Sequence, residues 1–216
     1  LYRGNGDNSF TRYDASSIKK PIRSAVLFDF NHDPAIDMAG VWTNSVIVFS
    51  GQLDADFQVA LSAPSVDSTF SVNAADFNQD GWDDVAVGTR EGLDIYLNDQ
   101  SGGLTKAYHY DQAFGVADID VTNQGSDFND DGRYDLCLAT PSVGGLTSEL
   151  MVYIGNPDGS FDQRLIKTVQ GQIFADCVGD FNGDATLDIA FINGAKRYLS
   201  ILFGNGAGDF LNEMRF

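Results

Sequence analysis

Residues 127–135 read Asp-Phe-Asn-Asp-Asp-Gly-Arg-Tyr-Asp, and the same nine-residue pattern occurs three more times in the chain. The pattern is Asp, Phe, Asn, a variable residue, Asp, three variable residues and Asp. The other copies begin at Asp29, Asp76 and Asp180, so successive copies start 47, 51 and 53 residues apart. A regular period of this length predicts one continuous array of repeats.

Each copy places side-chain oxygens at positions 1, 3, 5 and 9 of a short segment. Hard oxygen ligands at this spacing are typical of a Ca²⁺-binding loop. The alternative for any single copy is an Asx-rich turn that binds nothing, and the fourfold repetition favours the metal. The predicted side-chain ligands are Asp29, Asn31, Asp33 and Asp37; Asp76, Asn78, Asp80 and Asp84; Asp127, Asn129, Asp131 and Asp135; and Asp180, Asn182, Asp184 and Asp188.

The loops differ from a helix–loop–helix calcium hand, which needs a bidentate acid at position 12 and a helix after it. Position 12 is Gly40, Val87, Leu138 or Phe191, and none of these is a ligand. Apolar runs follow every loop instead, namely Met38–Trp42, Val85–Val87, Leu136–Leu138 and Ile189–Ile192. Each loop is therefore expected to lead into a β-strand.

A second recurring element is an apolar run, a turn rich in Gly, Asn and Asp, and then Phe or Leu. Such a sequence pattern predicts a β-hairpin. It occupies Val46–Phe57, Asp94–Leu104, Met151–Phe161 and Ser200–Phe210, and it also opens the chain as Leu1–Phe10. With a strand before and after each loop, every unit has about four short strands, which is typical of a β-propeller blade.

The predicted fold is therefore all-β, a β-propeller-type array of four-stranded blades in a single domain over residues 1–216. It consists of an N-terminal half repeat (1–20) and four full repeats (approximately 21–65, 66–112, 113–170 and 171–216), the third with an insertion around 117–126. The phenylalanine at position 2 of each loop is expected to pack in a core, at a gain of roughly 1.5–3 kcal/mol per ring. These phenylalanines are Phe30, Phe77, Phe128 and Phe181.

The loop, the Val-Ala-Val-Gly run at residues 85–88 and the later Gly-Asn-x-x-Gly-x-Phe turn resemble the FG-GAP/VCBS repeat. That family is similar to the calcium-bearing blades of integrin α-subunit propellers and of some extracellular proteins and lectins. The resemblance implies a further ligand, the backbone carbonyl at position 7. The carbonyls in this chain belong to Ala35, Trp82, Arg133 and Thr186.

Position 6 of such a loop is normally glycine, because a positive φ is needed there. Gly81 and Gly132 satisfy this, whereas Ala185 and Pro34 do not. Proline has φ locked near −65° and has no N–H. We therefore expect two to four Ca²⁺ ions, with the second and third loops strongest, the fourth next and the first weakest.

The formal charge of −18 comes from 31 acidic residues, of which 28 are Asp, against 13 basic residues. This balance argues against a nucleic-acid partner. No apolar run approaches the ~20 residues that span a bilayer, so membrane insertion is not expected. The start at Leu1 without a visible signal peptide indicates a mature or excised piece, and calcium loops favour an extracellular location, secreted or at the cell surface.

Two cysteines, Cys137 and Cys177, lie in consecutive repeats. They form an inter-repeat disulfide or are two buried thiols, and the sequence leaves both open. Only two histidines are present, and no constellation of an enzyme is evident, so the chain is not expected to be an enzyme.

The expected role is that of a calcium-stabilised extracellular structural or adhesion module with a protein partner or self-association, including a fibre or oligomer. The alternative is a carbohydrate-binding lectin propeller, because Trp82 and Tyr134 lie on loops, Trp42 follows one, and aromatic rings stack on sugars. The opening half repeat has three explanations: a piece of a longer array, a small ring with an accessory hairpin, or pairing between subunits.

Overall fold

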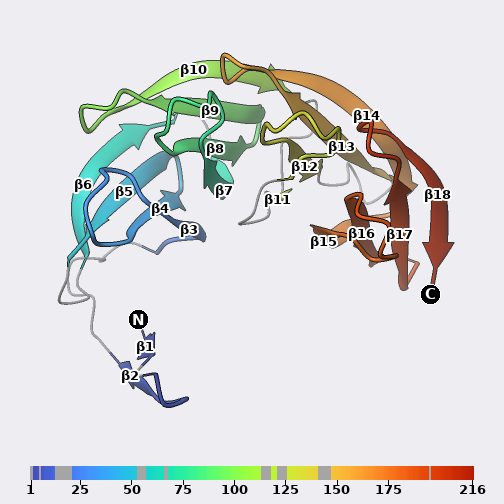
Figure 1. Cartoon of the computed structure of the whole chain (residues 1–216), viewed down its shortest axis with the longest axis horizontal. Coiled ribbons are helices and arrows are strands. Elements are labelled where there is room, and N and C mark those ends of the chain that lie inside the picture. Colours follow the sequence, from blue (N-terminus) through green and yellow to red (C-terminus); the bar gives the residue numbers. More distant parts are fainter. Residues whose placement is uncertain are drawn as a thin grey trace.

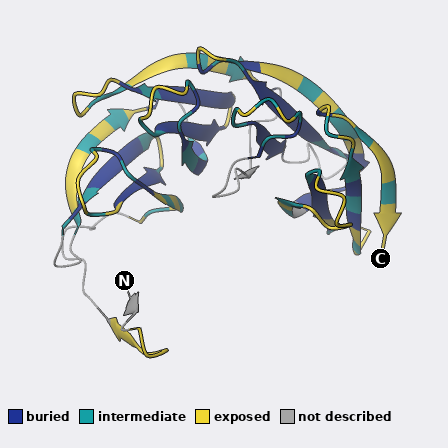
Figure 2. Cartoon of the chain, viewed as in Figure 1, coloured by how far each residue is buried: buried dark blue, intermediate teal, exposed yellow. Residues whose placement is uncertain are grey.

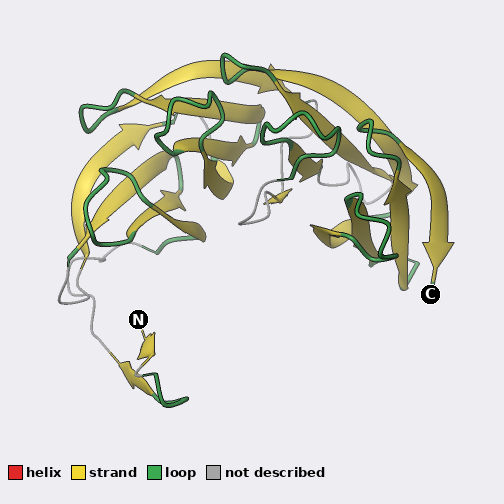
Figure 3. Ribbon diagram, in the orientation of Figure 1, coloured by secondary structure: helices red, strands yellow, loops and turns green. Residues whose placement is uncertain are grey.

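The computed structural model describes residues 2–4, 6–12, 21–52, 57–65, 68–112, 118–120, 126–140, 147–194 and 196–216. Within these residues the chain contains strands and loops and no helix (Figure 3). The strands form four four-stranded antiparallel sheets and one two-stranded hairpin. The predicted all-β class is confirmed. None of the described segments makes a helix long and apolar enough to cross a membrane.

Every four-stranded sheet is a simple meander, in which each strand pairs with the next strand along the chain. The first sheet contains β3 (Ser24–Phe28), β4 (Asp37–Trp42), β5 (Ser45–Gly51) and β6 (Phe57–Pro64), and the second contains β7 (Thr69–Ala75), β8 (Asp84–Thr89), β9 (Gly92–Asn98) and β10 (Leu104–Asp111). The third contains β11 (Asp118–Asp120), β12 (Leu136–Ala139), β13 (Thr147–Gly155) and β14 (Phe161–Gln170), and the fourth contains β15 (Ile173–Gly179), β16 (Asp188–Asn193), β17 (Tyr198–Gly204) and β18 (Phe210–Arg215). The hairpin pairs β1 (Tyr2–Gly4) with β2 (Phe10–Arg12).

The four sheets lie side by side in an open arc, with the first and fourth sheets at its two ends (Figure 1). The first strand of each sheet lies on the concave side, and β6, β10, β14 and β18 form the convex rim. Each pair of neighbouring sheets shares an apolar core: Val48 with Val85, Leu93 with Leu136, and Val152 with Phe191 are examples from the three clusters.

The burial of a strand follows its place in the sheet. In the second sheet β8 has a neighbouring sheet on both faces and is wholly buried, as expected for a near-continuous apolar run. In the first sheet β4 is also almost wholly buried, and a separate cluster in which Ile22, Trp42 and Phe57 pack against Met38, Ile47 and Phe49 covers its residues outside the core shared with the second sheet. The rim strands β6 and β10 are half-buried or exposed along most of their length, and Figure 2 shows them in yellow and teal outside the dark blue interior.

The packing role predicted for the phenylalanine at position 2 holds in three of the four loops. Phe30, Phe77 and Phe128 are 3%, 0% and 3% exposed. Phe181 is 46% exposed, so the prediction is wrong for this residue. The reason is its position in the arc, since no further sheet covers the outer face of the fourth sheet in the part of the chain that the structure describes.

Two other sequence expectations are affected by the described structure. Cys137 is buried on β12, Cys177 is exposed on β15, and no disulfide joins the two. The alternative of two buried thiols is therefore right for Cys137 alone. The half repeat (1–20) and the insertion around 117–126 lie partly outside the described residues, which there include β1, β2 and β11.

Candidate metal-binding loops

All four signature loops lie at corresponding ends of their sheets. Each loop joins the first strand to the second, and each hairpin turn joins the third strand to the fourth. In an antiparallel meander these two connections are at the same end, so every sheet presents one loop and one turn together. The residues predicted as loop ligands therefore all lie at one edge of the array.

The aspartate at position 9 is fully buried in every loop, at 0% exposure. One of its oxygens accepts the N–H of position 2, at 2.8–3.1 Å, and the other accepts the N–H of the residue that ends the third strand, at 2.8–2.9 Å. In the second loop, Phe77 and Asn98 donate these two bonds to Asp84. The carboxylate therefore ties the loop to the start of the hairpin turn.

The residue that ends the third strand is glycine in three sheets because the backbone approaches closely there. A Cβ at Gly51, Gly155 or Gly204 would lie 2.1–2.4 Å from the carbonyl oxygen of loop position 8. In the second sheet Asn98 takes this place, and its side chain donates to the carbonyl oxygens of Phe30 and Asp83.

The remaining predicted side-chain ligands close each loop around its own backbone. In the second loop, the Asp76 carboxylate accepts the N–H of Asp80 at 3.0 Å and of Gly81 at 2.8 Å. The Asn78 amide donates to Asp80 at 3.0 Å, and the second oxygen of Asp80 accepts the N–H of Trp82 at 2.9 Å. The third and fourth loops repeat these bonds, with Asp127 and Asp180 in the place of Asp76.

The first loop lacks the bond from position 6. In the other loops the N–H of Gly81, Gly132 or Ala185 donates to the first aspartate at 2.7–3.0 Å. Pro34 has no N–H to donate. Asp29 accepts the N–H of His32 at 2.8 Å, a bond from position 4 that Gly183 also donates to Asp180 in the fourth loop.

Left-handed backbone occurs at two positions of the loop, and the sequence indicates only one of them. Position 6 has φ of 90°, 80° and 70° at Gly81, Gly132 and Ala185, as expected from the resemblance. Position 4 is also left-handed, with φ of 56–59° at His32, Gln79 and Asp130 and 80° at Gly183. Side chains with a Cβ are uncommon in this region, so three of these four residues gave no signal in the sequence.

The third loop contains its own cation. The Arg133 guanidinium forms an ion pair with Asp131, and its Nε donates to the Gly155 carbonyl at 2.9 Å. Arg133 was predicted to contribute only its backbone carbonyl, and its side chain is a contact that the spacing did not indicate.

Burial sets the acidity of the position 9 aspartates in the first three loops. It raises the pKa of Asp84 to about 7 and of Asp135 to about 6, with smaller additions from the other aspartates of the same loop. Burial likewise raises the pKa of Asp37. The two N–H donors lower the pKa in each case, so they offset part of the cost of desolvation.

The donor chemistry of these loops fits a hard cation. The signature side chains of each loop comprise three carboxylates and one amide, and neither nitrogen nor sulfur ligands are present among them. Among the described residues no three acidic, His or Cys side chains converge in an arrangement that would hold a metal ion. Coordination would require the Asn-to-Asp side-chain bonds, such as that from Asn78 to Asp80, to open.

Neighbouring loops are linked along the edge of the array. The His32 imidazole stacks on the Trp82 indole, with ring centroids 4.0 Å apart and planes at 12°. The Gln79 side chain donates to the Gly132 carbonyl at 2.7 Å, which joins the second loop to the third. These residues occupy variable positions of the signature, so the repeat pattern did not identify them.

Each loop also touches the hairpin turn of the following sheet. The Asn98 amide donates to the Phe30 carbonyl at 3.0 Å, and the Gly208 N–H donates to the Phe128 carbonyl at 2.8 Å. Between the second loop and the third sheet, a Cβ at Gly159 would lie 3.2 Å from that of Asn78. The loop of one sheet thus packs against the turn of the next at three successive interfaces.

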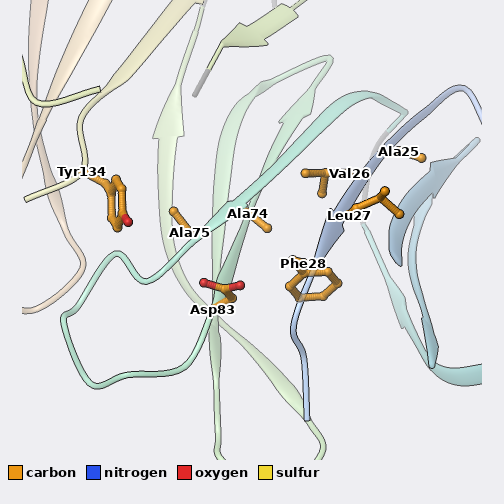
Figure 4. Close-up of a pocket in the computed structure, with 8 residues that line it drawn as sticks. All are labelled: Ala25, Val26, Leu27, Phe28, Ala74, Ala75, Asp83 and Tyr134. Atoms are coloured by element: carbon orange, nitrogen blue, oxygen red, sulfur yellow. The ribbon is translucent and has the colours of Figure 1, made fainter. Parts of the chain in front are cut away.

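A cavity of about 390 Å³ opens beside the loops, on the side of the first strands (Figure 4). Its lining comes from β3 and β7 and from Asp83 and Tyr134, which occupy position 8 of the second and third loops. Burial raises the pKa of Asp83, whose carboxylate accepts the Asp29 N–H at 3.3 Å. The other lining residues are Ala25, Val26, Leu27, Phe28, Ala74 and Ala75.

A search of curated proteins found no match to this chain. A scan against protein families matched one segment, which begins at the first residue of the third loop, includes the whole hairpin β13–β14 and ends on β16 after the fourth loop. Residues 127–191 match the model described as an FG-GAP-like repeat, and this match is consistent with the FG-GAP/VCBS repeat family.

Proposed function

We propose that the chain is a calcium-stabilised, non-enzymatic module of β-propeller type that makes structural or adhesive protein contacts outside the cell. The FG-GAP-like repeat supports a protein-interaction or adhesion role. The four meander sheets, their packing in an arc and the strand order from the concave to the convex side support blades of a propeller.

The observation that carries the proposal is the placement of the loops. Four loops with the same oxygen donors lie at one edge, and three of them pack against the turn of the following sheet. A cation bound in such a loop would hold the carboxylates of one sheet next to a neighbouring sheet. Its role would therefore be to stabilise the stacking of the repeats.

Calcium would be held by the side chains at positions 1, 3, 5 and 9 and by the carbonyl of position 7. The ion would supply positive charge that offsets the repulsion between the carboxylates of a loop. The second and fourth loops have no arginine paired with the aspartate at position 5 among the described ion pairs, whereas Arg133 pairs with Asp131 in the third. Extracellular calcium is abundant, which is the reason for proposing that location.

The carbohydrate-binding alternative depends on exposed aromatic rings. One face of the Trp82 ring is engaged by His32, and Tyr134 lines the cavity rather than a flat surface. Neither observation favours a lectin over a protein-interaction module, so the latter is proposed.

The test is the thermal stability of the chain with and without calcium. Calcium should raise the melting temperature and a chelator should lower it, because a ligand that binds only the folded state stabilises it. In Asp76→Asn, Asp127→Asn and Asp180→Asn combined, the calcium-dependent shift should be reduced. Asp111→Asn is the matched control, since Asp111 lies on β10 with its side chain 97% exposed.

Equal melting temperatures in calcium and in chelator would contradict the calcium part of the proposal. Binding of sugars on a glycan array, lost in Trp82→Ala, would replace the interaction role with the lectin.

A further inference from the structure

The fourth sheet carries an apolar face whose counterpart is buried in each of the other sheets. We name it the end face, and it consists of Phe181, Ile192 and Leu199, which are 46%, 46% and 38% exposed. The residues equivalent to Leu199, five positions before the end of the third strand, are 0–1% exposed: Val46, Leu93 and Leu150. Those equivalent to Ile192, at position 13 of the signature, are all buried: Val41, Gly88 and Ala139.

In the other sheets the following sheet covers this face in a repeated way. At the interfaces of the second sheet with the third and of the third with the fourth, the aromatic residue that opens the fourth strand of the next sheet packs edge-on against the loop phenylalanine. At the first interface Leu104 takes that place. Phe161 contacts Phe77 with centroids 5.5 Å apart and planes at 74°, and Phe210 contacts Phe128 at 5.6 Å and 71°. An occupant of the end face should therefore offer an aromatic ring at the start of a hairpin's second strand.

The β1–β2 hairpin has this feature in both sequence and register. Gly4-Asn5-Gly6 is followed by Phe10, as Gly204-Asn205-Gly206 is followed by Phe210. Gly4 pairs with Phe10 across the hairpin, as Gly204 pairs with Phe210 and Gly155 with Phe161. Phe10 is 67% exposed, so its ring is available.

Charge favours the same contact. The hairpin segment, residues 1–12, contains Arg3, Arg12 and Asp7, a net charge of +1, whereas residues 24–216 carry −21. The end face borders the fourth loop, which contributes Asp180, Asp184 and Asp188. A basic segment is thus matched to an acidic edge, which speeds and orients association.

We propose that the end face binds the β1–β2 hairpin of a second copy of the chain, with Phe10 edge-on against Phe181. A second copy is the occupant because the hairpin and the end face are at opposite ends of the open arc (Figure 1). An isolated two-stranded hairpin is at best marginally stable, so docking would stabilise it. One donor and one acceptor on each chain generate a head-to-tail assembly. The inference rests on the proposed interaction role and names its partner.

Light scattering over a range of concentrations tests the proposal. The mass of the wild-type chain should rise with concentration beyond that of a dimer. Phe10→Ser and Phe181→Ser should each weaken association by about 10- to 100-fold, as expected when a buried aromatic contact at an interface centre is removed. Leu165→Ser is the matched control, because Leu165 is a 55% exposed apolar residue on the convex rim, and it should assemble like wild type.

Mixing the two variants separates this arrangement from others. Phe10→Ser retains the end face and Phe181→Ser retains the hairpin, so an equimolar mixture should form a dimer and stop there. A wild-type chain that stays monomeric at every concentration, whether from closure on itself or from no contact, overturns the proposal. So does assembly that neither substitution weakens. Stabilisation by calcium is measured separately, so its presence without assembly would leave the proposed function standing and remove only this inference.

Discussion

The ring of Phe210 packs edge-on against the ring of Phe128, and the two residues belong to adjacent sheets 82 positions apart in the sequence. The Gly208 N–H, two residues before Phe210, donates to the Phe128 carbonyl. The fourth sheet thus contacts the third loop twice, through a backbone hydrogen bond from its hairpin turn and through the ring of Phe210. Phe77 and Phe161 repeat the aromatic contact one sheet earlier.

Truncating the loop phenylalanine should have different costs in the third and fourth loops. Phe128→Ala removes a ring that is 3% exposed, and such changes lower the free energy of unfolding by about 3–5 kcal/mol. Phe181→Ala, at 46% exposure, should cost about 1 kcal/mol or less. Denaturant unfolding of both variants at low protein concentration checks this, in a Phe10→Ser background to exclude assembly. Equal costs would show that the ring acts within its own loop.

Removal of the Asp84 carboxylate should be destabilising even without calcium. Asp84→Ala leaves the N–H groups of Phe77 and Asn98 buried without an acceptor, at about 1–3 kcal/mol each. The measurement is denaturant unfolding in chelator, with Asp111→Ala as the exposed control. An Asp84→Ala variant as stable as wild type in chelator would mean that this residue acts only through a metal ion.

A glycine in place of Pro34 should improve the first loop. Pro34→Gly supplies an N–H at position 6 and permits the positive φ that Gly81 and Gly132 adopt. Calorimetric titration should then show one additional calcium ion, or a clearly higher affinity for the last one bound. In chelator the variant should be slightly less stable, by about 0.4–1 kcal/mol, because the unfolded chain gains freedom.

Pro157→Gly, in the hairpin turn between β13 and β14, is the control for loss of a proline. The interpretation of the first loop fails if Pro34→Gly and Pro157→Gly leave the calcium titration equally unchanged.

Acid should weaken the contact between the rims of the third and fourth sheets. Hydrogen bonds from Arg215, and then from Lys167 and Ser200, lower the pKa of Glu213 from 4.5 to about 2. Because the folded-state pKa is depressed, the stabilisation is fully present above about pH 4.5 and is lost as the pH falls towards 2. Wild type should therefore exceed Glu213→Gln in unfolding free energy by about 1 kcal/mol at pH 7.

The difference between wild type and Glu213→Gln should shrink as the pH is lowered from 4.5 to 2, as measured by denaturant unfolding at each pH. Taking the difference removes the contribution of the many aspartates that titrate in the same range. Lys167 Nζ lies 2.7 Å from Glu213 Oε2. A difference in unfolding free energy that stays constant down to pH 2 would contradict the role assigned to this pair.

Local patterns were sufficient for the strands and the loop frame. The apolar runs after the signatures correspond to β4, β8, β12 and β16. The turn sequences rich in Gly, Asn and Asp correspond to the turns of the four hairpins. Position 6 was readable because glycine marks a positive φ. These features depend on residues close together in the sequence, where spacing carries the information.

Contacts between units were not readable in the same way. The stack of His32 on Trp82 joins variable positions 50 residues apart, and the exposure of Phe181 depends on the absence of a covering sheet. The signature makes Phe181 identical to Phe128, so only the arrangement of sheets distinguishes them. The left-handed backbone at Gln79 and Asp130 likewise results from closure of the loop, and the identity of these two side chains did not predict it.

The packing of each loop against the turn of the next sheet affects how the molecule unfolds. Among the residues that the structure describes, the second and third sheets have a neighbouring sheet on each side, whereas the first and fourth have one. The stability of such an array is approximately a sum over nearest neighbours. Amide hydrogens of β16 and β17 should exchange with solvent through local opening events that leave β8 and β12 protected. The array then frays from its ends inward, and whatever caps the fourth sheet also governs the lifetime of the sheets behind it.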